Sequence, residues 1–198
     1  MTSEANLRIA DTELTLPEVS ATAGNNGYRI GSLLKETGAV TYDPGFANTA
    51  TTSSSITYID GDNGELQYRG YPIEQLAEQS NFVEVCYLLI YGELPTQEQY
   101  DAFDARLRGH TIVHEDLRRF FRAVPYDAHP MPMVAAAVAA LSTVYQDDLD
   151  VFDEDQIDTS SFRLLAKMPT IAALAHRKNM GLPVIHPDNS LSLVENFL

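Results

Sequence analysis

The clearest structural signal in the sequence is the stretch ITYIDGDNGELQYRGY, residues 56–71. β-Branched and aromatic residues fill both of its arms, and turn-forming residues lie between them, which is the pattern of a β-hairpin. Asn63-Gly64 tolerates the positive φ that such turns demand. From Pro72 onward the pattern becomes helical, so this stretch separates a strand-bearing part of the sequence from a helical part.

The segment before the hairpin, residues 1–55, is rich in Thr, Ser, Gly and Asn and has only short apolar stretches. Leu14 and Leu16 alternate with polar residues and precede Pro17, a pattern that predicts a short edge strand. We therefore predict a small strand-bearing N-terminal segment, followed by residues 56–198 as the hairpin plus the first part of a large helical domain.

Helical signals begin after the hairpin. Residues 82–91 are apolar nearly all round, which predicts a helix buried on every side, and Gly92 is a natural C-terminal stop. Thr96 and Gln99 have the spacing of a capping box and predict that a new helix starts there.

Two later segments suit helix–helix contacts. Met131 to Tyr145 holds five alanines between positions 135 and 140, so another helix could approach closely. Phe162 to Lys178 is interrupted by Pro169, which predicts a kink or two abutting helices. Ser190 is predicted to cap a last short helix.

Composition excludes several classes of partner. The net charge of −15 repels nucleic acids and anionic membranes. The longest apolar run, Val134 to Leu141, is far shorter than the ~20 residues that span a bilayer. The only cysteine, Cys86, lies among apolar residues and is expected to be an inert core thiol. With no recognisable secretion signal, these features predict a cytoplasmic protein.

No metal site is predicted. His110 and His114, followed by Glu115, resemble part of an HExxH motif, but Arg118 stands where the second His of that motif belongs. The stretch Asp147 to Asp158 holds seven acidic residues but lacks the turn glycine of a calcium loop. We predict that it is a solvated connection.

Arg163 and Lys167 are four residues apart on a predicted helix, where like charges repel unless an anion lies between them. That anion could be a phosphate or carboxylate ligand, or a side chain of the acidic stretch just upstream. From the residues alone, the chain is an acidic, mainly α protein with no identifiable catalytic group.

The sequence resembles the citrate synthases, in particular bacterial members with a small strand-rich N-terminal segment. The resemblance covers residues 28 to 198 and is carried by four stretches, TYDPGFANTATTSSSITYIDGDNGELQYRGYPIEQLAEQSNFVEVCYLLIYGELPTQEQY (41–100), HTIVHEDL (110–117), DAHPMPM (127–133) and FRLLAKMPTIAA (162–173). It implies a mainly α fold. This fold would be part of the citrate-synthase-like large helical domain, preceded by N-terminal strands.

The resemblance also implies an acyltransferase. In the family, acetyl-CoA condenses with oxaloacetate and water to give citrate and CoA at the entry to the tricarboxylic acid cycle. Acetyl-CoA is a substrate, so no cofactor is implied. The family's catalytic Asp and two His follow the position that matches Leu198, so no catalytic residue is assigned here and this chain alone is expected to be inactive. A 2-methylcitrate synthase and a short non-catalytic helical partner subunit remain alternatives.

Two kinds of partner follow from the resemblance. The family implies a dimer-based homo-oligomer through helices 131–145 and 162–178. Some bacterial relatives also bind NADH as an allosteric inhibitor, and Gly109 stands where those relatives carry Arg. The residues here that resemble their NADH site are His110, Thr111, Tyr145, Arg163, Lys167 and Asn189.

Overall fold

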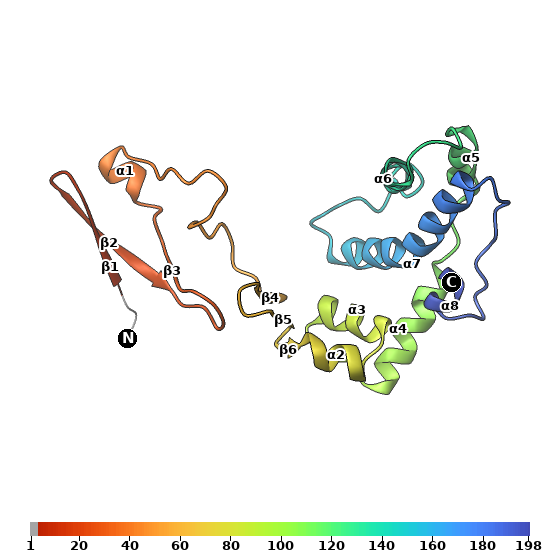
Figure 1. Ribbon diagram of the computed structural model, residues 1–198, viewed down its shortest axis with the longest axis horizontal. Helices are drawn as coiled ribbons and strands as arrows, with labels where there is room; N and C mark the ends of the chain where they lie inside the picture. The colour runs from red at the N-terminus through yellow and green to blue at the C-terminus, as the bar shows by residue number, and fades with distance from the viewer. Residues whose placement is uncertain (1–3) are drawn as a thin grey trace. The chain divides into compact units, whose positions relative to one another are not determined.

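The computed structural model describes residues 4–198 (Figure 1). The chain divides into two compact units, one up to Leu94 and the other from Pro95 to Leu198. This grouping differs from the predicted boundary at residue 55, because the hairpin and the two helices that follow it belong to the first unit. The predicted division into domains stays a prediction.

The first unit contains two small antiparallel sheets, each of three strands in the order of the chain. The strands of the first sheet are β1 (Glu4–Ile9), β2 (Thr12–Val19) and β3 (Gly27–Tyr28). Those of the second are β4 (Thr57–Asp60), β5 (Glu65–Tyr68) and β6 (Tyr71–Pro72).

Leu14 and Leu16 lie in a strand, as predicted, but this strand is not at an edge. β2 is the central strand of the first sheet. Pro17 is tolerated there because it lies opposite Glu4, where β1 begins, and its carbonyl still accepts from the Arg29 N–H at 2.9 Å. The two leucines are buried with Leu33 of α1 (Leu33–Thr37) and form the small core beneath this sheet.

The predicted hairpin is confirmed as β4 and β5, which pair from Thr57 opposite Tyr68 to Asp60 opposite Glu65. The Asp60 carboxylate closes the turn by accepting from the backbone N–H groups of Asp62 and Asn63, both at 3.1 Å. Gly64 has a φ of 70°, the left-handed conformation that favours glycine.

Two helices follow, α2 (Ile73–Gln79) and α3 (Phe82–Tyr91). The predicted bounds of α3 are confirmed. Asn81 forms a capping box at its start, and Gly92, with a φ of 95°, ends it by donating to the Leu88 carbonyl at 2.8 Å.

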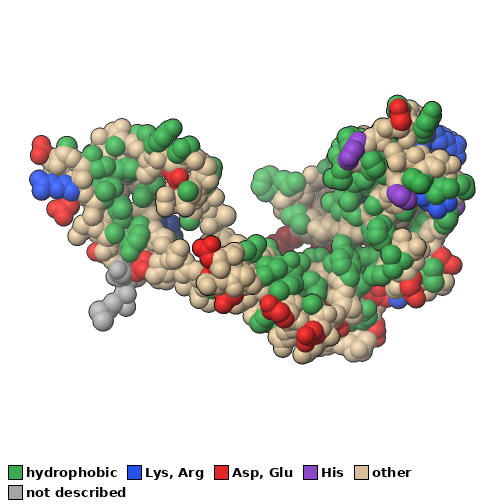
Figure 2. Space-filling view, in the orientation of Figure 1, with side chains coloured by type: hydrophobic (Ala, Val, Ile, Leu, Met, Phe, Trp, Pro, Cys, Tyr) green, Lys and Arg blue, Asp and Glu red, His purple; other side chains and the backbone are tan. Residues whose placement is uncertain are grey.

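The prediction that α3 is buried on every side was wrong. Val83 and Leu88 are buried, but Phe82 is 54 % exposed and Tyr91 is 47 % exposed. Figure 2 shows hydrophobic side chains at the surface over this helix. Apolar composition gives a helix the capacity to be buried, but burial also needs packing partners, and this small unit supplies them on one face only.

All regular secondary structure in the second unit is helical. Its helices are α4 (Gln97–Gly109), α5 (Glu115–Ala123), α6 (Pro130–Leu141), α7 (Glu154–Asn179) and α8 (Leu193–Phe197). The capping box predicted at Thr96 and Gln99 is confirmed. None of the helices within residues 4–198 combines the length and apolar character that crossing a membrane requires.

The core of this unit lies between α5, α6 and α7. Figure 1 shows α6 end-on while α7 lies across the view, so the two helices cross steeply. Ala137 is fully buried in α6, and its small side chain allows the backbones to approach closely. The larger buried side chains of the core are Leu117, Phe121, Met133, Leu141, Ile171 and Leu174.

Three predicted helix boundaries differ from the structure. The helix predicted over 131–145 ends at Leu141 and continues as a turn. The segment 162–178 belongs to one continuous helix of 26 residues, because Pro169 removes a single N–H donor while buried side chains on both sides of it hold the helix together. The last helix is capped by Ser192, in a capping box with Glu195, and not by Ser190.

The acidic stretch is more than the solvated connection that the sequence predicted. Its second half forms the first turn of α7, because the Asp153 side chain accepts from the N–H groups of Asp155 and Gln156 and so caps the helix. Glu154 and Asp155 then place negative charge at the positive end of the helix dipole.

Replacing Asp153 with Ala should lower the free energy of unfolding by about 1 kcal/mol, because two N–H groups at the start of α7 lose their acceptor. Urea denaturation followed by circular dichroism measures the change. The control is Asp147→Ala, which removes an exposed carboxylate of the same stretch and should change stability by less than about 0.5 kcal/mol. Equal effects of the two substitutions would contradict the capping role.

Candidate functional site

The six residues that the sequence singled out lie together in the second unit. His110 is the C-cap residue of α4, and Thr111 follows it in the loop to α5. Tyr145 comes from the turn after α6, whereas Arg163 and Lys167 come from α7. Asn189 lies in the segment before α8. Four separate parts of the chain therefore meet at one cluster.

Lys167 is the centre of this cluster. It is only 2 % exposed, and its Nζ donates to the carbonyl oxygens of His110 at 2.5 Å and Ile112 at 2.8 Å. The Thr170 hydroxyl, one turn along α7, donates to the carbonyl of Thr111 at 2.9 Å. α7 thus supplies the hydrogen-bond donors for three successive carbonyls of a loop that has no regular secondary structure of its own.

The surroundings of Lys167 weaken its proton affinity. Burial lowers the pKa of Lys167 to about 8, and the positive charge of Arg163 acts in the same direction. The ammonium group is compensated by carbonyl oxygens, so its role in the structure is to hold the loop in place.

Arg163 is bound on two sides. Its Nη1 lies 2.6 Å from Asp148 Oδ2, and its guanidinium lies 4.3 Å from the centre of the Tyr145 ring. Of the two anions that the sequence allowed beside Arg163, the structure shows the side chain from the acidic stretch. Among residues 4–198 no carboxylate pairs with Lys167, which binds carbonyls instead.

A second ion pair next to the cluster was not foreseen. Arg106 of α4 lies 2.6 Å from Asp158 Oδ2 of α7, and its guanidinium also stacks over Phe162 at 3.7 Å. The two partners are 52 positions apart in the chain. No local pattern marks such a pair, so only the fold could reveal it.

His110 and Asn189 complete the cluster. Burial lowers the pKa of His110, and the charges of Lys167, Arg163 and Arg106 lower it further. The buried Thr111 hydroxyl lies 3.2 Å from Asn189 Oδ1, which ties the segment before α8 to the loop after α4. The result is a positively charged cluster with an aromatic ring on one side.

The other candidates from the sequence have structural surroundings. His114 does not share a helix face with His110, because α4 ends at Gly109, before either histidine. The Nδ1 of His114 instead caps α5 by accepting from the Asp116 N–H at 3.2 Å. Within residues 4–198 no group of three or more His, Cys, Asp or Glu side chains could hold a metal ion. Cys86 is half-buried, and burial raises its pKa to about 11, so the thiolate is disfavoured.

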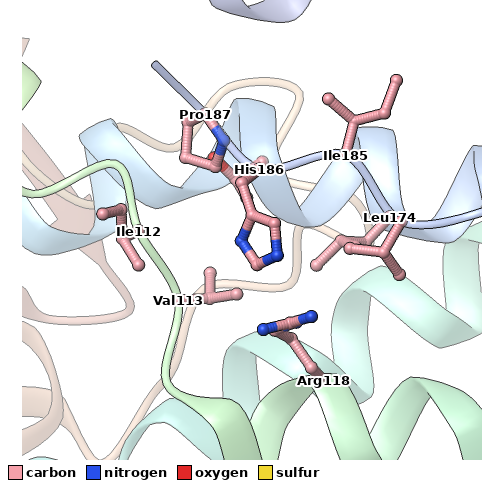
Figure 3. Close-up of a pocket in the computed structure, with 9 residues that line it drawn as sticks. Ile112, Val113, Arg118, Leu174, Ile185, His186 and Pro187 are labelled. Carbon is pink, nitrogen blue, oxygen red and sulfur yellow. The ribbon is translucent and has the colours of Figure 1, made fainter. Parts of the chain in front are cut away.

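A small pocket lies beside the cluster (Figure 3). Ile112, Val113 and Leu174 form apolar parts of its wall, and Figure 3 shows His186 pointing toward Val113 and Arg118. Arg118 is already paired, with its Nη1 2.6 Å from a Glu115 carboxylate oxygen. The pocket walls are thus mostly apolar, and their one cation is neutralised.

Comparison with known families shows what the chain is similar to. The family model described as citrate synthase, C-terminal domain, matches residues 45–198. The chain belongs to the citrate synthase family. Citrate synthase 1 of Mycobacterium tuberculosis is 58 % identical over 194 residues, which are 98 % of this chain and 45 % of that protein. Citrate synthase of Corynebacterium glutamicum is 49 % identical over 196 residues, again 45 % of its length.

The citrate synthase fold is also found among solved structures. The ternary complex of carboxymethyl coenzyme A and oxaloacetate with citrate synthase from Thermoplasma acidophilum matches with a TM-score of 0.72 at 25 % identity. The match covers 79 % of this chain and 41 % of that one. This chain therefore spans less than half the length of the citrate synthases it matches, and its structure is the mainly α fold that the sequence predicted.

Replacing Lys167 with Met should lower the free energy of unfolding by about 2 kcal/mol, because the carbonyls of His110 and Ile112 lose a buried charged donor. Urea denaturation measures the loss. Lys178→Met, near the end of the same helix, removes a long hydrogen bond of 3.3 Å and should cost much less. Equal losses for the two variants would contradict the central role of Lys167.

His110 should make stability depend on pH. Its pKa is lower in the folded chain than in the unfolded one, so the unfolded chain binds the proton more readily. The stability that neutral His110 contributes is present above its ordinary pKa of about 6.5 and is lost as the pH falls through the lower, folded value. The free energy of unfolding should therefore fall less between pH 7 and pH 5 in His110→Asn than in the unmodified chain. Parallel curves would disprove this.

Proposed function

We propose that this chain provides the N-terminal part of a citrate synthase, which condenses acetyl-CoA with oxaloacetate in the cytoplasm. The observation that carries the proposal is the 58 % identity to a citrate synthase along 98 % of the chain. The fold supports it, since the similar Thermoplasma enzyme was solved with carboxymethyl coenzyme A and oxaloacetate. The relatives named above favour citrate synthase over 2-methylcitrate synthase.

We further propose that residues 1–198 alone do not catalyse this reaction. Condensation needs a base for a weakly acidic methyl group, donors for the enol oxygen and cations for a dicarboxylate. The cations of the Lys167 cluster already have partners within the chain. His114 and His129 both act as helix caps through Nδ1. The remainder of the enzyme is expected to supply the catalytic groups.

The test is thiol release from acetyl-CoA in the presence and absence of oxaloacetate. Residues 1–198 alone should give no oxaloacetate-dependent turnover, and a mixture with the separately expressed remainder of the enzyme should restore it. Turnover by the 198-residue chain alone would refute the proposal. A mixture that stays inactive, although the two parts associate, would favour a non-catalytic partner subunit.

We also propose that the cluster of His110, Thr111, Tyr145, Arg163, Lys167 and Asn189 binds NADH as an effector. The cations of the cluster suit the pyrophosphate of a dinucleotide, and the Tyr145 ring offers a surface for stacking. Gly109 contributes no side chain, so Arg163 would have to carry more of the anion binding. The titrations in the next subsection test this role.

The enzyme is proposed to self-associate through α6 and α7. Ala135, Ala136 and Ala139 are exposed on α6, and their small side chains allow a second helix to approach closely. On α7, Leu164 is 42 % exposed and Met168 is 37 % exposed. These exposed apolar side chains support the proposal that α6 and α7 form the dimer contact.

Substituting Ala136→Arg together with Ala139→Arg should dissociate the intact enzyme, because bulk and charge enter a close helix contact. Sedimentation velocity measures the change. The control is Ala102→Arg with Ala105→Arg, which adds the same charge to exposed positions of α4. If the α6 variant keeps the sedimentation coefficient of the unmodified enzyme, the contact lies elsewhere.

A further inference from the structure

The cations of the Lys167 cluster are satisfied inside the chain. Arg163 is paired with Asp148 at 2.6 Å, and the ammonium of Lys167 is held by two backbone carbonyls. Arg106, the neighbouring cation, is paired with Asp158 at 2.6 Å. An incoming anion therefore meets a cluster whose positive groups already have partners, and it competes with them for the same donors.

We propose that Asp148 is a built-in competitor that holds this anion site closed. Its carboxylate takes the Nη1 of Arg163, so an anionic ligand gains this donor, and escapes the repulsion of the carboxylate, only when Asp148 moves away. The proposal rests on the role of the cluster as an effector site, and it adds how that site is regulated.

Asp148 is the partner best placed to move. It lies in the connection between α6 and α7, and its side chain is 37 % exposed. The side chain of Asp158 is about as exposed, at 36 %, but its backbone is held within α7, so only its side chain can turn away from Arg106. Lys167 is buried, and releasing it would leave two loop carbonyls without their donor.

The turn that carries Asp148 also carries Tyr145. The Asp148 N–H donates to the Tyr145 carbonyl at 3.2 Å, and the Ser160 hydroxyl donates to the Asp148 carbonyl at 3.2 Å. Arg163 contacts both the ring of Tyr145 and the carboxylate of Asp148. The two backbone hydrogen bonds do not involve the carboxylate, so the side chain of Asp148 can leave Arg163 while the turn and the ring contact stay in place.

Replacing the Asp148 carboxylate with a phosphate exchanges one oxygen acceptor of Arg163 for another. A carboxylate and a phosphate both offer oxygen acceptors to a guanidinium, and no proton has to move when one replaces the other. While Asp148 is in place it also repels an approaching anion. The apparent affinity is therefore reduced by the small fraction of molecules in which Arg163 is free.

The experiment measures dissociation constants for inorganic pyrophosphate and for NADH in the intact enzyme at low ionic strength. Asp148→Asn should lower both constants about tenfold, since it removes the competing charge and keeps the size of the side chain. The matched control is Asp147→Asn, which makes the same change of net charge at an exposed neighbour that pairs with no residue in the described part of the chain. It should shift either constant less than twofold.

The outcomes separate the two proposals. Equal affinities in Asp148→Asn and Asp147→Asn overturn the competitor role of Asp148. If Arg163→Gln nevertheless loses NADH binding, the proposal that the cluster binds NADH still stands. Tighter pyrophosphate binding in Asp148→Asn with no NADH binding in any variant supports the competitor and overturns the NADH role. Absence of all binding overturns both. If Asp148→Asn fails to fold, Asp148→Ser must give the same tightening, and an unchanged affinity in Asp148→Ser overturns the proposal.

Discussion

The helical unit depends on one buried cation. The Nζ of Lys167 bridges the carbonyls of His110 and Ile112, and Thr170 of the same helix binds the carbonyl between them. A buried ammonium without partners would cost several kcal/mol, so the loop between α4 and α5 and the long helix α7 can only be stable together. This contact holds the loop that follows α4, and with it the positions of His110 and Thr111 in the cluster.

Electrostatics explains why a strongly acidic chain can carry a compact group of cations. The chain has a net charge of −15, yet Arg106, Arg163 and Lys167 lie close enough to depress the pKa of His110. Asp148 and Asp158 neutralise the two arginines, while Lys167 has backbone oxygens. The acidic stretch therefore contributes a helix cap at Asp153 and counter-charges to the cluster.

Local signals in the sequence were sufficient where a structure depends on near neighbours. The hairpin from Thr57 to Tyr68, the start of α3 after Asn81 and the capping box at Thr96 all follow from a few adjacent residues. Predictions failed where a distant partner decides. Leu14 and Leu16 were assigned to an edge strand because nothing in their own stretch reveals β1 or β3 on either side.

The sequence by itself determined the helical class, the hairpin, the end of α3 at Gly92 and the cap at Thr96. Through resemblance it also indicated the family and the six residues of the candidate effector site. Only the tertiary structure decided that those residues meet, that Asp148 and Asp158 pair with Arg163 and Arg106, and that α7 continues through Pro169. The physical reason is the separation in sequence between the residues that interact. Turns and caps are set by hydrogen bonds between residues a few positions apart. A buried lysine is bound by carbonyls more than 50 residues away, and that contact exists only once the helices have packed.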